Sequence, residues 1–321
     1  MKSRLIVNPV SGTDSAPDLL PLLNERLRDA FGDVDIVMTV ERGDAARLAE
    51  GAAREGYERL FVAGGDGTLN EVLNGVAAVE GALRRVTFGL VPLGTGNDFA
   101  GALGLPEDVE EAVAVLSRGR VVETDVGLLN DRFFVNVSAG GFIAEVSDAV
   151  NPQLKTLTGK FAYVIGGAQV LMDYEPAGAR VSRDGGAGRE QPLQMFAVCN
   201  SRLVGGGRLI APHALIDDGL LDVCLVGAMP TLEFVSLLTS VAGGDHIEDE
   251  RVTYFRARRL DISFGRAVKV NTDGEVLETD RCRYRLLPRA ARFLAGDAPF
   301  ASSGQQAAGS GQKAESSSSK Q

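Results

Sequence analysis

The chain has 321 residues, of which 45% are hydrophobic, and its formal net charge is −10. This length is typical of two domains with sizeable cores, and the negative charge argues against a general nucleic-acid-binding protein. No apolar run approaches the roughly 20 residues that span a bilayer, and the N-terminus lacks the apolar region of a signal peptide. We therefore expect a cytoplasmic protein without a transmembrane segment.

The first part of the chain alternates short apolar runs with helical periodicity. Strands are predicted at Arg4–Asn8, Val34–Thr39, Glu58–Ala63 and Val86–Pro92. Helices are predicted at Pro17–Phe31, at Asp44–Glu55 with Asp44 as the N-cap, at Leu69–Val79 and at Glu107–Leu116. This β-α-β-α order favours a parallel sheet covered by helices.

The pattern changes near Asp125, after which short strands dominate. They are predicted at Arg132–Val137, Leu193–Cys199, Leu220–Val226, Arg259–Phe264, Val268–Asn271 and Arg281–Leu287, and helices are predicted near Lys160–Asp173 and Pro230–Val241. Many short strands with glycine-rich turns favour an antiparallel, sandwich-like domain. Residues 301–321 contain no Val, Leu, Ile, Phe or Met, so we expect a disordered tail there.

Cysteine and histidine are scarce. Cys199, Cys224 and Cys282 are far apart and form no metal-binding spacing, so reduced, buried thiols are expected. The only histidines are His213 and His246, which argues against histidine-based metal sites and Ser-His-Asp catalysis.

A glycine-rich turn, Gly64-Gly65-Asp66-Gly67-Thr68, joins a predicted strand to a predicted helix. The N–H groups of such a turn and the positive helix end attract phosphate, and glycine lets the backbone approach a ligand closely. A phosphorylated ligand, most simply a nucleotide, is therefore predicted. The alternatives are a capping box of Thr68 and Glu71 and an ordinary Asp-Gly turn.

A second glycine turn, from Leu93 to Asp98, follows the strand predicted at Val86–Pro92. Ligands of open α/β sheets bind beyond the carboxyl ends of the strands, and enzyme sites favour clefts. Both glycine turns lie at such strand ends, so they can face one cleft.

The charge is uneven along the chain. Between Arg251 and Arg292 there are eleven basic and five acidic residues, a net charge of +6, which leaves −16 for the rest. Arg281, Arg283 and Arg285 would share one face of a strand. One hypothesis is that this face, with Arg256 and Arg258, approaches anionic lipid headgroups. The alternative is a solvated edge strand protected by charge.

Four segments together resemble one family. They are Asn8-Pro9-Val10-Ser11-Gly12, the segment from Gly64 to Glu71, the segment from Pro92 to Ala100, and Asp273-Gly274-Glu275. Over residues 3 to 295 the chain resembles soluble bacterial lipid kinases of the diacylglycerol kinase catalytic-domain family, which includes sphingosine and ceramide kinases. Gly-Gly-Asp-Gly-Thr also occurs in NAD kinases, whereas Gly-Thr-Gly-Asn-Asp-Phe-Ala favours lipid kinases.

The resemblance implies an N-terminal nucleotide-binding α/β domain with a parallel sheet and a mainly β, sandwich-like C-terminal domain. The expected bounds are 1–127 and 128–287, with residues 288–300 returning to the first domain. The implied reaction is ATP-dependent phosphorylation of a lipid hydroxyl with Mg²⁺, most simply of diacylglycerol to phosphatidic acid.

The resemblance also assigns nucleotide-binding positions. These are Asn8, Pro9, Ser11, Gly12, Thr39, Gly64, Gly65, Asp66, Gly67, Thr68, Glu71, Gly94 and Thr95. Asp66 is implied to be catalytic as well. Glu275 is the candidate general base for the proton of the lipid hydroxyl, with a solvated hairpin tip as the alternative.

Three aspartates are expected to form an acidic cluster around Mg²⁺, because this ion prefers oxygen ligands. They are Asp66, Asp98 and Asp125. Alternatively, Asp98 caps a helix that begins at Phe99, and Asp125 is an ordinary turn residue.

The segment Ala214–Leu220 resembles a family segment that holds a second, structural Mg²⁺. The implied ligands are the carbonyls of Leu215 and Leu220 and the carboxylate of Asp218, and the alternative is a tight Asp-Asp-Gly turn.

The identity of the acceptor stays open at this point. A sphingoid base, ceramide or phosphatidylglycerol are alternatives to diacylglycerol, followed by an NAD-kinase-like enzyme with a soluble substrate and by a nucleotide-binding module without turnover. The expected partner is a lipid substrate at the membrane surface, visited transiently from the cytoplasmic side, and not a nucleic acid. The oligomeric state is open, with a homodimer as one alternative.

Overall fold

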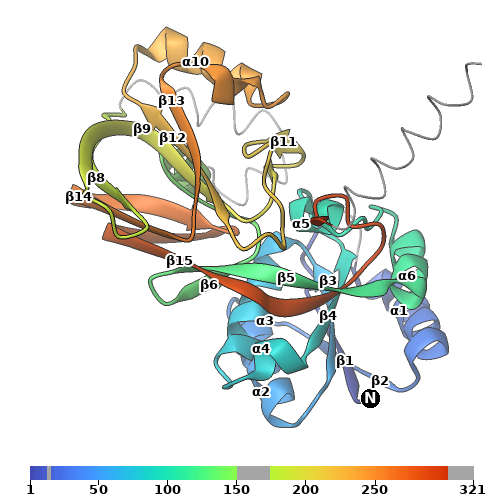
Figure 1. Ribbon diagram of the computed structural model, residues 1–321. Helices are drawn as coiled ribbons and strands as arrows, with labels where there is room; N and C mark the ends of the chain where they lie inside the picture. The colour runs from blue at the N-terminus through green and yellow to red at the C-terminus, as the bar shows by residue number, and fades with distance from the viewer. Residues whose placement is uncertain (13–15, 150–173, 303–321) are drawn as a thin grey trace, which may run out of the picture. The chain divides into compact units, whose positions relative to one another are not determined.

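The computed structural model describes residues 1–12, 16–149 and 174–302, which divide into two compact units (Figure 1). Unit 1 comprises Met1–Val126, Leu215–Gly219 and the chain from Leu287 onward, and unit 2 comprises Gly127–Ala214 and Leu220–Leu286. The helix predicted near Lys160–Asp173 and residues 303–321 of the predicted tail lie outside the described residues. None of the described helices has the length and apolar character needed to cross a membrane.

Unit 1 is built on a parallel sheet with the strand order β2-β1-β3-β4, and the last part of β15 pairs with β4. The strands are β1 (Ser3–Val7), β2 (Val34–Met38), β3 (Arg59–Gly64), β4 (Thr87–Pro92) and β15 (Glu275–Ala295). The central residues of β1, β3 and β4 are buried, as expected for strands covered on both faces, whereas Asp35, Ile36 and Val37 of the edge strand β2 are partly or fully exposed. Because β3 pairs with β1 rather than with β2, the strand order reverses between β1 and β3.

Helices cover this sheet in two groups. They are α1 (Ala16–Phe31), α2 (Asp44–Arg54), α3 (Asp66–Ala77), the short α4 (Ala82–Arg85) and α5 (Asp98–Ala102), and α6 (Val109–Arg118). Helix α1 packs with α6 and α2 packs with α3, and Figure 1 shows the two pairs on opposite sides of the strands. The close crossing of α2 and α3 depends on Gly75, where a Cβ atom would lie 2.1 Å from the carbonyl oxygen of Ala46.

Two expectations for the helix starts are wrong. Gly43, not Asp44, precedes α2 as its N-cap, in a left-handed conformation. Asp44 is the first helical residue, and its carboxylate accepts N–H bonds from Val40 at 2.9 Å and Glu41 at 3.2 Å. Helix α3 begins at Asp66 rather than at Leu69, so the last three of the five residues of the glycine-rich turn lie in the first turn of the helix.

Unit 2 is antiparallel. Its neighbouring strands pair in the order β13-β12-β9-β7-β14-β15, and β8 pairs with both β9 and β14. The strands are β6 (Arg132–Phe134), β7 (Val137–Gly141), β8 (Ala177–Arg183), β9 (Arg189–Cys199), β10 (Leu203–Val204), β11 (Arg208–Leu209), β12 (Leu221–Gly227), β13 (Val252–Ala257) and β14 (Arg259–Thr272). The two strands predicted at Arg259–Phe264 and Val268–Asn271 are one strand, β14, whose register shifts between Ser263 and Val268.

Side chains of unit 2 form two apolar cores. Successive residues of β9 alternate between them: Phe196 and Val198 enter one, and Met195 and Ala197 enter the other. Helices α7 (Phe142–Ala149) and α10 (Thr231–Ser240) contribute to the second core. All three cysteines are free and buried, as expected, and burial raises the pKa of Cys224 and of Cys282 to about 12.

The chain crosses between the units more often than predicted. Strand β5 (Arg120–Leu129) contains Asp125, which rules out the interpretation of Asp125 as a turn residue. The Asp125 N–H donates to the Ile216 carbonyl at 2.6 Å, and this places Leu215–Gly219 in unit 1 although we expected it in the second domain. The first two residues of the predicted tail are also ordered: Ala301 is fully buried and Ser302 contacts Asp217.

Candidate active site

The reversal point of unit 1 brings two predicted loops together. The first loop follows β1 and the second follows β3, and ligands of open α/β sheets bind at this place. Asn8 donates from Nδ2 to the hydroxyl oxygen of Thr68 at 2.9 Å, and its Oδ1 accepts the Val10 N–H at 3.2 Å. Asn8 therefore fixes both its own turn and the first turn of α3.

The two glycine turns touch through their backbones. A Cβ atom on Gly94 would lie 2.5 Å from the Cα atom of Gly65, and a Cβ atom on Gly64 would lie 2.7 Å from the Thr68 side chain. Asn97, with φ of 51°, closes the second turn because its amide accepts from the Gly94 N–H at 2.9 Å and donates to the Gly94 carbonyl at 2.7 Å. Only glycine at these positions permits this spacing.

The first turn of α3 has the character of an anion site. Its N-cap residue, Gly65, offers no side-chain cap to the helix, so the N–H groups at this end keep the positive potential that favours phosphate. The proposed capping box is not formed: both carboxylate oxygens of Glu71 accept the Gly43 N–H at 3.2 Å, while Thr68 accepts from Asn8.

Asp66 connects the two turns. Its carboxylate accepts the N–H groups of Asp98 and Phe99, each at 3.2 Å, and so caps the start of α5. The alternative in which Asp98 caps this helix is therefore wrong, since Asp98 is its first residue. Burial, followed by the nearby Asp98 carboxylate, raises the pKa of Asp66. A carboxylate that folding keeps in so unfavourable a setting is a candidate functional group.

The remaining predicted nucleotide contacts lie at the same carboxyl edge of the sheet. Thr39 follows β2 and is 9% exposed, with its N–H bonded to the Val7 carbonyl at 2.9 Å. Gly12 has φ of 82°, and a Cβ atom there would lie 2.1 Å from the Leu93 carbonyl oxygen, so the loop after β1 also approaches the loop after β4. Thr95 is exposed at the tip of the second glycine turn.

A second group of carboxylates surrounds the Leu215–Gly219 loop. Asp125 is fully buried, and its carboxylate accepts the N–H groups of Gly219 at 2.6 Å and Arg289 at 2.7 Å. Burial raises the pKa of Asp125, and the Asp217 carboxylate contributes in the same direction. Asp217 accepts both the N–H and the hydroxyl of Ser302 at 2.7 Å.

The expected single cluster of Asp66, Asp98 and Asp125 is not formed. Among the described residues, no three Asp, Glu, His or Cys side chains lie close enough to hold one metal ion. The carboxylates occur instead as two pairs, Asp66 with Asp98 and Asp125 with Asp217. Local spacing did not reveal this, because Asp125 is held by contacts with residues 94 and 164 positions away.

In unit 2, Glu275 begins β15 directly after a two-residue turn. Asp273 and Gly274 both have positive φ, and Thr272 pairs with Glu275 across the hairpin. The Asp273 side chain is 7% exposed and accepts the N–H groups of Val135 and Val137 at 2.8 Å and of Asn136 at 3.2 Å. Glu275 is half-buried, so this is an anchored turn rather than a solvated hairpin tip.

Sequence analysis assigned no role of their own to four residues that shape these sites. They are Asn97, Asp217, Asp273 and Ser302, and each acts through hydrogen bonds to backbone or to a distant side chain. Only Asn97 and Asp273 carry a local signal, because each precedes or lies within a turn that requires positive φ.

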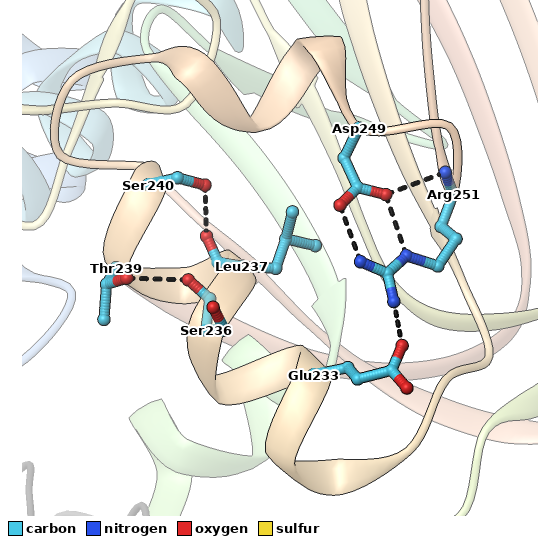
Figure 2. Close-up of polar contacts among 7 residues, drawn as sticks. All are labelled: Glu233, Ser236, Leu237, Thr239, Ser240, Asp249 and Arg251. Atoms are coloured by element: carbon cyan, nitrogen blue, oxygen red, sulfur yellow. Dashed lines mark hydrogen bonds and ion pairs between the residues drawn. The ribbon is translucent and has the colours of Figure 1, made fainter.

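A cavity of about 490 Å³ in unit 2 lies between α10 and the residues around η1 (Asp245–Glu248), and none of its lining residues belongs to the predicted site. Figure 2 shows the polar contacts at its wall, where Arg251 binds Asp249 through two guanidinium nitrogens and also contacts Glu233. These residues join α10 to the start of β13.

Comparisons with known proteins place both halves of the chain. Residues 2–129 match the diacylglycerol kinase catalytic domain, and residues 136–295 match the YegS C-terminal NAD kinase beta sandwich-like domain. Proteins named diacylglycerol kinase are similar over 85% of this chain: that of Staphylococcus carnosus is 36% identical (88% of its length) and that of Bacillus subtilis 32% identical (89%). A crystal structure of a putative diacylglycerol kinase from Bacillus anthracis covers 92% of this chain and 97% of its own, with a TM-score of 0.78 and 28% identity. The chain therefore belongs to the diacylglycerol kinase catalytic-domain family and is a lipid kinase with an α/β domain followed by a sandwich-like β domain.

Proposed function

We propose that this lipid kinase transfers the γ-phosphate of ATP to the hydroxyl of diacylglycerol and produces phosphatidic acid. The observation that carries the nucleotide site is the contact of Gly65 with Gly94 beside the uncapped start of α3. Three loops meet there at the reversal point of a parallel sheet, and their glycines admit a phosphate chain. The curated relatives that carry the name diacylglycerol kinase support the acceptor.

The proposed roles follow from the contacts. Asn8, Ser11, Gly12 and Thr68 would bind and orient the phosphates from the loops after β1 and β3, with Thr39, Thr95 and Glu71 as neighbours. Asp66 would keep the two glycine turns in register through its bonds to the start of α5. Glu275 would accept the proton of the lipid hydroxyl, held in place by the buried Asp273.

Two groups of aspartates fit Mg²⁺, because carboxylate and backbone carbonyl oxygens are ligands for a hard cation. Asp66 and Asp98 would hold an ion near the phosphates. Asp125, Asp218 and the carbonyls of Leu215 and Leu220 would hold a structural one. When bound, Mg²⁺ neutralises phosphate charge. A cation would also stabilise the ionised carboxylates of Asp66 and Asp125, whose pKa values are raised by burial.

Transfer of labelled γ-phosphate from ATP to lipids in mixed micelles with Mg²⁺ tests this function. The panel contains diacylglycerol, a sphingoid base, ceramide and phosphatidylglycerol, with NAD as a soluble acceptor. Labelled phosphatidic acid from the wild type, lost in Asp66→Ala and Glu275→Gln, is the expected result. Label in another lipid would replace the acceptor, and label in NAD alone would overturn the lipid assignment.

A further inference from the structure

The outer face of β8, β14 and β15 in unit 2 carries a group of arginines. Exposure alternates along β15: Arg281, Arg283 and Arg285 are exposed, whereas the residues between them are buried. On the neighbouring strand Arg259 lies directly opposite Arg285. Arg180 lies opposite Ser263, which in turn is the partner of Arg281. We call Arg180, Arg259, Arg281, Arg283 and Arg285 the arginine face.

Acidic side chains offset only part of this charge. Glu190 forms an ion pair with Arg180 at 3.5 Å, and Asp261 is the register partner of Arg283. The arginine face thus has three positive charges in excess on a chain whose net charge is −10. Within the described residues, no ion pair neutralises the guanidinium groups of Arg281, Arg283 and Arg285. Arg256, which we expected to join them, instead pairs with Asp222.

Fold stability does not account for this arrangement. Like charges directly opposite each other on neighbouring strands are destabilising, and Arg259 and Arg285 form such a pair. Protection of a free sheet edge is also not the reason, because β15 is bonded on both sides here. It pairs with β14 on one side, and on the other Asn130 bonds to the backbone of Arg281 and Arg283 at 3.0–3.1 Å.

We propose that the arginine face binds the anionic headgroups of a lipid bilayer and so docks this lipid kinase on the membrane that contains its substrate. Exposed arginines recur about every 6.8 Å along β15 and about 4.8 Å across the strands, which presents several charges to one surface at once. Each such charge near an anionic surface strengthens binding roughly fivefold. The proposal rests on the proposed function in one respect: a lipid substrate indicates that the anionic partner is a bilayer rather than another polyanion.

Vesicle flotation with the full chain tests the proposal. The vesicles contain phosphatidylcholine with or without phosphatidylglycerol, and the variants are Arg281→Ser/Arg283→Ser/Arg285→Ser and the same three positions changed to Lys. The matched control removes three exposed arginines of unit 1, through Arg84→Ser/Arg85→Ser/Arg118→Ser. We expect the wild type to bind only the anionic vesicles, with binding reduced about 100-fold in the first serine variant, within about fivefold of wild type in the control, and retained in the lysine variant.

Several outcomes would overturn the proposal. They are equal binding of the wild type and the first serine variant, an equal loss in the control, binding to neutral vesicles, and a preference for duplex DNA over anionic vesicles. Phosphorylation of a short-chain diacylglycerol in neutral detergent separates docking from chemistry. In this assay Arg281→Ser/Arg283→Ser/Arg285→Ser should keep wild-type turnover. Absence of turnover in the wild type would count against the proposed function and leave the vesicle-binding result intact.

Discussion

Removal of the Asp273 carboxylate should loosen the turn that presents Glu275. Three buried N–H groups, those of Val135, Asn136 and Val137, donate to this side chain, and the Asp273 N–H returns a bond to the Val137 carbonyl at 3.0 Å. A carboxylate with several backbone donors is held in one orientation. Asp273 is therefore a positioning residue for Glu275 rather than a reacting group.

The expected magnitude follows from these contacts. Each buried donor left without a partner costs about 1–3 kcal/mol, so the loss of the acceptor for three donors in Asp273→Ala should lower the free energy of unfolding of unit 2 by roughly 3–9 kcal/mol. Asp273→Asn keeps one acceptor oxygen and places an NH₂ group against a donor. It should cost about 2 kcal/mol, close to the loss of one charge-assisted bond.

Hydrogen exchange resolves this prediction at individual amides. In Asp273→Asn the amides of Val135, Asn136 and Val137 should exchange faster, and turnover should fall. The control, Glu275→Gln, should leave their protection and the melting temperature unchanged while it lowers turnover by about 100-fold or more. Wild-type exchange at all three amides in Asp273→Ala would refute the reasoning, because the carboxylate would then not be their acceptor.

Three further results are expected. Gly94→Ala should raise the KM for ATP at least tenfold, because opening the backbone contact with Gly65 should cost on the order of 1.4 kcal/mol of binding free energy. The control Gly51→Ala, at an open helical position, should instead stabilise the protein by about 0.5–1 kcal/mol. Equal kinetics of the two variants would contradict this prediction. Asp66→Asn should abolish phosphoryl transfer yet leave the melting temperature at pH 8 equal to or higher than that of the wild type. The reason is that burial raises the pKa of Asp66, so folding penalises its ionised form. A clear loss of stability would show that the charge is structural. Burial lowers the pKa of His246 below 6.5, so as the pH falls the unfolded chain binds a proton before the folded protein does. The stability contribution of this histidine is therefore complete above pH 6.5, and below pH 6.5 it should decrease by up to about 1.4 kcal/mol per pH unit. Calorimetric scans of wild type and His246→Asn between pH 7.5 and 5.5 should show a smaller decrease in the variant.

The sequence predicted those features that depend on local pattern. Apolar runs of four to six residues located the parallel strands, and glycines at the ends of β3 and β4 located the two turns that touch, because close backbone approach requires glycine. The start of α3 was misplaced by three residues, since Asp66 and Gly67 read as a turn although their backbone is helical. The Asp-Gly pair likewise indicated the hairpin at Asp273 but not the burial of its carboxylate.

Features that depend on distant partners were not predictable in this way. Asp125 lies in a strand and binds Gly219 and Arg289, which are far away in the chain. The same contacts draw the Leu215–Gly219 loop out of unit 2. Neither periodicity nor spacing reveals such pairs, because their hydrogen bonds form only once the two distant segments lie side by side in the fold.

Three carboxylates, two in unit 1 and one in unit 2, share one structural feature that suits the roles we propose for these residues and their neighbours. Asp66, Asp125 and Asp273 accept backbone N–H groups, and at Asp125 the bond from Arg289 comes from its amide. Backbone donors fix the orientation of a carboxylate but, unlike a bidentate guanidinium, add no full positive charge. The pKa values of Asp66 and Asp125 are raised because burial disfavours the ionised carboxylate more than the backbone hydrogen bonds favour it. Such groups are oriented, and a dication bound beside them would favour their ionised form, which is the role that we propose for Mg²⁺ at the phosphate site.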